Sequence, residues 1–360
     1  MKNTTIEAKS APAYLQLYRQ MREDIVAGIY PRGGRLPSKR LLADEAGVST
    51  VTVEHAYALL YEEGYIEPRE RSGYFVIFRP SDGFAGTAEP MRHPRPVPHA
   101  PGEETEFPFP QLAKVMRRVI SDYGPVLLER SPGVGRPELR SAIGQYLARS
   151  RGIRVDTEQI VIGSGSEHLY GRIVEMFGRE RKYAIESPSY KKIEQVYRAA
   201  EVPLEMLPLG QDGIESAALW RTDAQVLHIS PYRSFPSGVT ASASKRHEYL
   251  RWAHPGRYII EDDFESEFSV SRKPEETLFS HTAEDNVIYM NTFSKTLSPG
   301  MRVGYMVLPR QLLPVFAARS GFYSCTVPTF EQLLLAELLE GGDFERHINR
   351  VRRKKRKEIE

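Results

Sequence analysis

The run Asn291 to Tyr305, NTFSKTLSPGMRVGY, combines residue types that could bind a ligand carrying both an aldehyde and a phosphate. Lys295 closely follows a strand-like apolar run, and a partly buried amine there could attack an aldehyde to form a Schiff base. The hydroxyls of Thr292 and Ser294 and the guanidinium of Arg302 could bind the phosphate. An isolated Ser-Lys pair would be a surface loop, but the whole run is far more specific than that pair.

Two further segments offer a phosphate cradle and a carboxylate. The turn containing Ser164, Gly165 and Ser166 follows a strand and opens a helix, so its backbone N–H groups could hold a phosphate. The acidic run from Glu261 to Asp263 follows another strand, where a carboxylate could keep a pyridine nitrogen protonated. Each segment also has a simpler interpretation, as a strand-to-helix turn and as an ordinary acidic loop.

Two loops could form the remaining walls of such a site. The loop from Glu186 to Tyr190, ESPSY, could present Tyr190 to stack on an aromatic ring, although a turn with a core tyrosine fits equally well. The loop from Ser230 to Gly238, SPYRSFPSG, is placed like a proline-glycine loop that contacts a cofactor.

These segments need a sheet to position them, and the chain beyond residue 110 has the pattern of one. Apolar strand-like runs alternate with amphipathic helical stretches such as 167–177 and 244–252. This alternation predicts an α/β/α domain with a mostly parallel sheet. The predicted strands are 159–162, 182–185, 225–229, 258–261, 287–291 and 304–308.

The first eighty residues predict a helix-turn-helix followed by a two-stranded wing. Two short helices meet at a turn around Gly47, and Ser49 caps the second helix, which spans 50–62. Strands at 65–66 and 74–77 flank a charged turn. On pattern alone, a small domain that binds protein is an equal alternative. We expect the first helix, 14–29, and the short helix after it to turn apolar residues toward the core. These residues are Leu15, Tyr18, Met21, Ile25, Ile29, Leu41, Leu42 and Ala46.

This stretch closely resembles the DNA-binding domain of the GntR family. The resemblance rests on the R-L-P-S start, the L-A-x-E-x-G-V-S turn, T-V-x-x-A-Y on the second helix, and E-G-Y-I and G-Y-F-V around the wing. It implies a double-stranded DNA operator with the second helix in the major groove. Many relatives carry arginine at the position of Thr50, which removes one means of reading guanine. The residues implied to contact DNA are Arg35, Ser38, Lys39, Arg40, Ser49, Thr50, Thr52, His55, Arg69 and Arg71.

The order and spacing of the five segments beyond the linker resemble fold-type I aminotransferases, and the whole chain resembles the MocR branch of GntR regulators. That resemblance implies pyridoxal 5'-phosphate as cofactor, an amine or amino-acid effector, and a homodimer. Lys295 would form the Schiff base, Asp262 would face the pyridine nitrogen, and Tyr190 would stack on the ring. The implied phosphate cup is Ser164, Gly165, Ser166, Thr292, Ser294 and Arg302.

Three departures from the family pattern bear on catalysis. Phe264 stands where relatives have a tyrosine, Arg233 replaces a histidine, and Phe235 replaces the asparagine of true aminotransferases. By the same resemblance, the end of the chain at Glu360 is expected to fall before the family's small C-terminal domain, whose arginine binds an α-carboxylate. These departures favour a regulator over an enzyme. A working aminotransferase with a DNA-binding head, and a regulator with a cofactor-free sensor domain, are the alternatives.

Composition sets the outer limits of this interpretation. The 360 residues are 41% hydrophobic and 27% charged, which is typical of a globular protein, and the net charge of +2 does not by itself indicate nucleic acid. A single cysteine, Cys325, excludes an internal disulfide framework and any cysteine-based zinc site, so no metal is expected. Without an apolar run or signal peptide, the chain is expected in the cytoplasm, with no membrane partner.

The same pass along the chain predicts the domain boundaries. Residues 11–79 form the winged helix-turn-helix, and residues 80–110, with eight prolines, form a linker. The aminotransferase-like domain follows at 111–345, and 346–360 would begin a C-terminal subdomain that is truncated. The basic run from Arg350 to Lys357 is more simply a solvated helix face than a second DNA contact.

Overall fold

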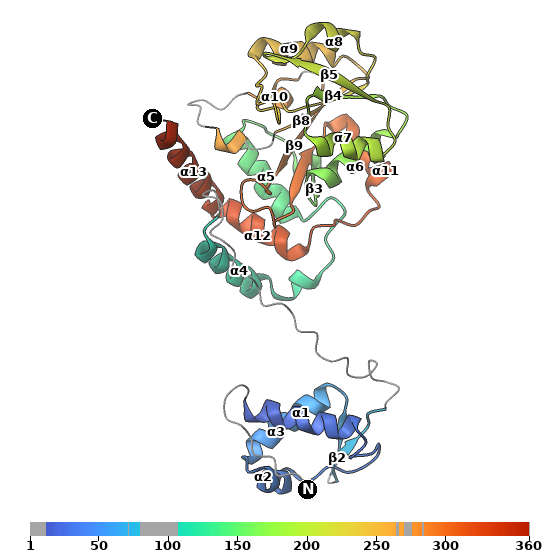
Figure 1. Ribbon diagram of the computed structural model, residues 1–360, viewed down its shortest axis with the longest axis vertical. Coiled ribbons are helices and arrows are strands. Elements are labelled where there is room, and N and C mark those ends of the chain that lie inside the picture. The colour runs from blue at the N-terminus through green and yellow to red at the C-terminus, as the bar shows by residue number, and fades with distance from the viewer. Residues whose placement is uncertain are drawn as a thin grey trace. The chain divides into compact units, whose positions relative to one another are not determined.

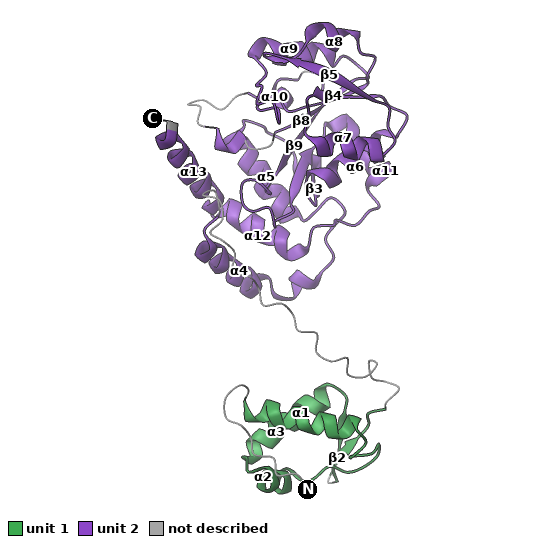
Figure 2. Ribbon diagram, viewed as in Figure 1, with its two compact units in different colours: residues 1–98 green, residues 99–360 purple. Residues whose placement is uncertain are grey.

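The computed structural model describes residues 12–70, 72–79, 107–263, 266–269, 276–282 and 284–359. The chain divides into two compact units, Met1–Pro98 and His99–Glu360 (Figure 2). Most of the predicted linker, together with Arg71 and Phe264, lies outside the described residues. Helix α4 begins at Phe109, inside the last part of the predicted linker. Among the described helices, none has the length and apolar character needed to cross a membrane.

Unit 1 is a three-helix domain with a two-stranded wing (Figure 1). Ser38 begins the second helix by accepting a hydrogen bond from the Leu41 backbone N–H at 3.2 Å, and Gly47 ends it in the left-handed conformation. Ser49 caps the third helix in the same way, accepting from Thr52 N–H at 3.1 Å. The elements are α1 (Ala13–Val26), α2 (Lys39–Ala46), α3 (Thr50–Glu62), β1 (Ile66–Arg69) and β2 (Gly73–Val76).

Two apolar residues predicted to lie in the core of unit 1 do not. Ile29 is 65% exposed because α1 ends at Val26 and the chain turns away through Gly28, which has φ +77°. Leu41 is 50% exposed, since α2 turns Leu42 toward the core instead. The wing strand β1 also extends into the segment predicted as a charged turn.

Unit 2 is built on an eight-stranded sheet of described residues, with the order β3-β10-β9-β8-β7-β4-β5-β6. Strands β9, β8, β7, β4 and β5 run parallel, whereas β10 is antiparallel to both of its neighbours and β6 is antiparallel to β5. The mostly parallel sheet predicted from the sequence is therefore confirmed. The strands are β3 (Ile160–Gly163), β4 (Tyr183–Ser187), β5 (Leu204–Gly210), β6 (Gly213–Ile214), β7 (Val226–Ile229), β8 (Tyr258–Asp262), β9 (Val287–Thr292) and β10 (Gly304–Val307).

Helices cover both faces of this sheet, which gives three layers (Figure 1). One face packs against α6 (Ser166–Phe177), α7 (Lys191–Ala199) and α11 (Leu313–Ser320). The other face packs against two groups of helices. The first group is α4 (Phe109–Tyr123), α5 (Pro137–Ser150), α12 (Thr329–Glu340) and α13 (Asp343–Ile359). The second group is α8 (Ser216–Arg221), α9 (Ala243–Trp252) and α10 (Leu278–His281). Short 3-10 turns are η2 (Gly124–Leu128), η3 (Thr157–Gln159), η4 (Ser266–Phe268) and η5 (Arg310–Leu312).

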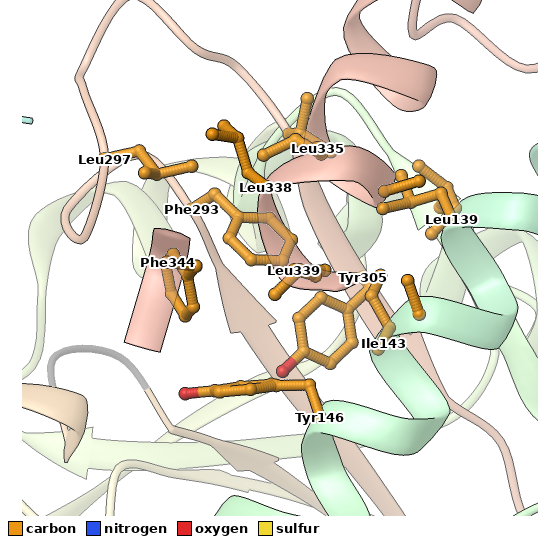
Figure 3. Close-up of a cluster of buried hydrophobic side chains, with 14 of the residues drawn as sticks. Leu139, Ile143, Tyr146, Phe293, Leu297, Tyr305, Leu335, Leu338, Leu339 and Phe344 are labelled. Atoms are coloured by element: carbon orange, nitrogen blue, oxygen red, sulfur yellow. The ribbon is translucent and has the colours of Figure 1, made fainter. Parts of the chain in front are cut away.

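The largest apolar cluster joins α5 and α12 to the strand β10 and the loop after β9 (Figure 3). Ile143 and Leu338 are fully buried, and Phe293 lies between Tyr305 and Phe344, with ring centroids 5.7 and 5.6 Å away. Phe293 is two residues before Lys295, so this core holds the base of the loop that carries the lysine.

A polar cluster lies buried on the same face of the sheet. Asp263, fully buried after β8, pairs with Arg151 at 2.7 Å and accepts a hydrogen bond from the Tyr289 hydroxyl at 2.6 Å. The Tyr305 hydroxyl is equally buried but has no hydrogen-bond partner among the described residues. A buried carboxylate depends on its donors, whereas a buried hydroxyl without a partner only costs desolvation.

These two tyrosines allow a matched test of the packing. Tyr289→Phe should lower the free energy of unfolding by about 1–3 kcal/mol, because Asp263 loses a donor inside the core. Tyr305→Phe should change it by less than about 0.5 kcal/mol or raise it, because it removes an unsatisfied hydroxyl. Urea unfolding of the full chain measures both. Equal losses for the two variants would contradict the assigned hydrogen bond.

Candidate cofactor pocket and nucleic-acid interface

A cavity of about 310 Å³ lies in unit 2, where β4, β8 and β9 end near the start of α6. The carboxyl edge of a parallel sheet is where α/β proteins place their ligands. Of the nine residues predicted to bind the cofactor, seven line this cavity, and Ser164 and Gly165 do not. The lining residues are Ser166, Glu167, Tyr170, Tyr190, Lys192, Ile193, Arg233, Phe235, Asp262, Thr292, Ser294, Lys295 and Arg302.

The start of α6 has the features of an anion site. Gly165 precedes the helix with φ +88° and, as a glycine, has no side chain to cap the first N–H groups. A Cβ on Gly165 would lie 3.0 Å from an Arg302 guanidinium nitrogen, so a side chain there would push the arginine slightly away from the backbone. Ser164, by contrast, bonds through its hydroxyl to Thr326 Oγ1 at 2.9 Å.

Two hydroxyls predicted to bind phosphate also shape the loop between β9 and β10. Thr292 Oγ1 donates to the Val303 carbonyl at 3.2 Å and accepts from Ser294 N–H at 3.2 Å. Ser294 Oγ donates to the Met301 carbonyl at 3.1 Å. These bonds close the loop that carries Lys295 and bring both hydroxyls to the cavity wall.

Asp262 is a buried carboxylate held by a chain of polar side chains. Its Oδ2 accepts a hydrogen bond from the Tyr170 hydroxyl at 2.5 Å and lies 3.4 Å from His228 Nε2. The other nitrogen of His228 lies 2.7 Å from the Tyr197 hydroxyl. Burial, reinforced by the charge of Asp262, raises the pKa of Tyr170 well above its ordinary value, so Tyr170 remains a donor. The network fixes Asp262 with one face toward the cavity.

Lys295 lines the cavity but is exposed, so the partial burial expected from the sequence is not observed. Tyr190 directly precedes α7, and its ring meets the Phe235 ring edge-on at 5.9 Å. Arg233 is also exposed on the cavity wall. The two unusual loop residues Arg233 and Phe235 therefore both face the pocket.

A buried glutamate supports the loop that carries these two residues. Glu186 accepts a hydrogen bond from the Ser234 hydroxyl at 2.7 Å. Burial raises the pKa of Glu186 to about 7, although the hydrogen bonds from Ser234 and from the Ser230 backbone oppose the shift. The attachment of the loop to β4 is therefore sensitive to pH near neutrality.

The structure adds pocket residues that the motifs did not indicate. Glu167 and Lys192 line the cavity and pair with each other, and Glu167 also pairs with Arg302 at 3.0 Å. Tyr170 contacts Asp262 from α6. The available signal was positional, since Glu167 follows the glycine turn by two residues and Lys192 follows Tyr190 by two.

The candidate DNA interface of unit 1 is the exposed side of α2 and α3. Thr50 is exposed at the start of α3, and Ser49 uses its hydroxyl to cap that helix and to bond Thr52 Oγ1 at 2.8 Å. Lys39 on α2 pairs with Glu54 on α3. Positions predicted to bind phosphate and to read bases thus lie on α2 and α3, but several of their side chains already have partners.

The remaining predicted DNA contacts lie around this surface and on the wing. Arg40 is exposed, and the backbone of Arg35 bridges to Phe75 on β2. His55 is exposed, with its ring edge-on to Tyr14. Arg69 lies 4.3 Å over the Phe75 ring and pairs with Glu67 at 2.9 Å. Ser38 contributes its hydroxyl to the cap of α2.

Comparison with known proteins matches each unit to a family. Residues 13–76 match the model of bacterial regulatory proteins of the gntR family, and residues 100–359 match that of aminotransferase class I and II. The chain is 33% identical over 360 residues to the uncharacterised HTH-type transcriptional regulator YdeL of Bacillus subtilis, covering 96% of this chain and 77% of YdeL. It is 30% identical over 370 residues to the probable rhizopine catabolism regulatory protein MocR of Rhizobium meliloti, covering 95% and 74%.

Solved structures of aminotransferases share the fold of unit 2. The α-aminoadipate aminotransferase LysN of Thermus thermophilus, solved with N-(5'-phosphopyridoxyl)-L-leucine, is 29% identical with a TM-score of 0.62. The match covers 70% of this chain and 65% of LysN. The chain therefore spans less than two thirds of this enzyme.

The pKa of Glu186 gives a testable pH dependence. Because the pKa of Glu186 in the folded chain, about 7, exceeds the ordinary value of 4.5, the folded chain binds an extra proton between these pH values. The contribution of Glu186 to the free energy of unfolding is therefore largest below about pH 4.5. It falls by up to about 3 kcal/mol as the pH rises to about 7. Glu186→Gln should thus gain stability relative to the wild type between pH 5 and pH 8 in urea unfolding. Exposed Glu158→Gln is the control, and a constant difference for Glu186→Gln would refute the shift.

The Lys39–Glu54 pair predicts how charge affects DNA binding. Glu54→Gln should tighten binding severalfold at low salt and steepen the salt dependence by up to about one unit, because Lys39 becomes available to phosphate. Fluorescence anisotropy on a labelled duplex measures this. Glu62→Gln, at the other end of α3, makes the same charge change as a control. Equal effects of the two substitutions would exclude this end of α3 from the interface.

Proposed function

The chain belongs to the MocR-type branch of GntR transcription regulators, with a GntR DNA-binding domain joined to an aminotransferase class I and II domain, and from this premise we propose that it binds pyridoxal 5'-phosphate at Lys295 to control DNA binding. One observation carries the proposal. Separate chain segments, from the start of α6 to the loop after β9, contribute seven of the nine predicted cofactor residues to one cavity.

The residues present fit this cofactor at both of its ends. At the phosphate end, the backbone N–H groups at the start of α6 and the Arg302 guanidinium close to Gly165 could together bind an oxyanion. At the ring end, Asp262 is buried and has only part of its hydrogen-bonding capacity satisfied by Tyr170. Lys295 lies on the wall of the same cavity.

Each side chain would then have a definite task. Asp262 would hold a proton on the ring nitrogen, with Tyr170 and His228 fixing its orientation. Tyr190 would cover one face of the ring, and Arg302 would bind the phosphate. The Thr292 and Ser294 hydroxyls would join it by turning their protons from the Val303 and Met301 carbonyls to the phosphate. Bound there, pyridoxal phosphate supplies an aldehyde that reacts with amines and a ring that withdraws electrons.

Regulation requires that the ligand favours one state of the protein over another. An amine or amino-acid effector, or the cofactor itself, can change DNA binding only through different affinities for the two states. We expect a cytoplasmic homodimer whose two DNA-binding heads contact half-sites separated by whole helical turns of about 10 base pairs. The domains that perform these tasks would be the winged helix-turn-helix at residues 11–79 and the aminotransferase-like domain at 111–345, joined by the linker 80–110.

The linkage between the pocket and DNA binding is tested with Lys295→Ala. A duplex selected by the full chain from a random library serves as operator, and anisotropy gives its Kd with and without pyridoxal phosphate. The wild type should show a shift of about fivefold or more, and Lys295→Ala should lose that shift but keep DNA binding without cofactor.

Lys191→Ala is the matched control, because this exposed lysine begins α7 and does not line the cavity. It should retain the full shift. An unchanged shift in Lys295→Ala, or no shift in the wild type, would contradict the proposed function.

A further inference from the structure

Glu167 places a carboxylate in the part of the pocket that would receive the phosphate. It is the second residue of α6, directly after Ser166 at the uncapped helix start. Its Oε2 accepts a hydrogen bond from Arg302 at 3.0 Å, and its Oε1 pairs with Lys192 Nζ. A side chain of this protein therefore bridges two cations that line the pocket.

The Glu167 carboxylate carries a full negative charge near neutral pH. The hydrogen bond from Lys192 is the main cause that lowers the pKa of Glu167, against partial burial, and Arg302 lowers it further. The start of a helix also favours the ionised form. Glu167 is thus charged over the range in which a phosphate ester is a dianion.

The bridge is also open to competition. The side chains of Lys192 and Arg302 are 50% and 49% exposed, and that of Glu167 is 33% exposed. Ion pairs at this exposure are weak, so an entering anion can take over the cations. A phosphate on Arg302 would then lie close to the Glu167 carboxylate and be repelled by it.

We propose that Glu167 is an internal competitor for the phosphate-binding cations and sets a low affinity of the pocket for phosphorylated ligands. Glu167 holds Arg302 and Lys192 until a phosphate displaces it, and its charge remains beside the bound phosphate. Occupancy then follows the free concentration of a phosphorylated aldehyde. This inference rests on the proposed function, because it concerns the same pocket.

Glu167→Gln tests the competition directly, since it removes the charge and keeps the size of the side chain. Absorption titration of the full chain should give a Kd for pyridoxal phosphate about tenfold lower than that of the wild type. Pyridoxal, which lacks the phosphate, should bind both proteins with Kd values within about twofold. Inorganic phosphate should displace pyridoxal phosphate from Glu167→Gln with higher affinity than from the wild type.

Two variants control for charge and for geometry. Glu194→Gln makes the same charge change on α7, where Glu194 pairs with Arg198 at 2.7 Å and does not line the cavity, so it should leave both Kd values unchanged. Glu167→Asp keeps the charge and should retain most of the low affinity.

Three results would overturn the inference. An equal or higher Kd of Glu167→Gln for pyridoxal phosphate would make Glu167 a supporting residue of the phosphate site. Equal tightening for pyridoxal phosphate and pyridoxal would show that the phosphate is not what Glu167 opposes. Absence of pyridoxal phosphate binding in the wild type and every variant would remove the proposed function as well, whereas the first two results leave it intact.

Discussion

The common direction of β4, β7, β8 and β9 is the constraint on which the pocket depends. Parallel strands end at one edge of the sheet, so segments far apart in the chain meet there. The register pairs Asp262 with Met290, which places the carboxylate beside the strand that leads to Lys295. Tyr190 reaches the same edge after β4. Helices α5 and α12 pack against the face of the sheet that does not carry α6 (Figure 3), so the loop that carries Lys295 contacts a packed core.

Electrostatics in both units follows one arrangement, in which a carboxylate of the chain pairs with a cation that we propose binds phosphate. In unit 1 Glu54 holds Lys39, and in unit 2 Glu167 holds Arg302. Exposed pairs of this kind contribute little to stability, about 0–1 kcal/mol. They can therefore open when DNA or a phosphate ester arrives, while the buried pair of Arg151 with Asp263 remains structural.

The sequence predicted the elements and the pocket more fully than it predicted the contacts. Apolar runs predicted six of the eight strands of the described sheet, because buried strands are continuously apolar. It missed β5, which contains Pro208 and Glu205, and the two-residue β6. It also missed the Glu167 bridge, because ion-pair partners depend on which helices the fold brings together. Motif positions locate a residue at a site but do not say whether its side chain already has a partner.

The central claim, that Lys295 anchors pyridoxal phosphate in this pocket, is tested most directly by absorption spectroscopy followed by borohydride reduction. The folded full chain is mixed with pyridoxal phosphate, its near-ultraviolet and visible spectrum is recorded, and the reduced protein is digested and mapped by mass spectrometry. The account predicts a new absorption band and a phosphopyridoxyl group on Lys295. A folded sample without a band, or a label distributed over other lysines, would contradict it.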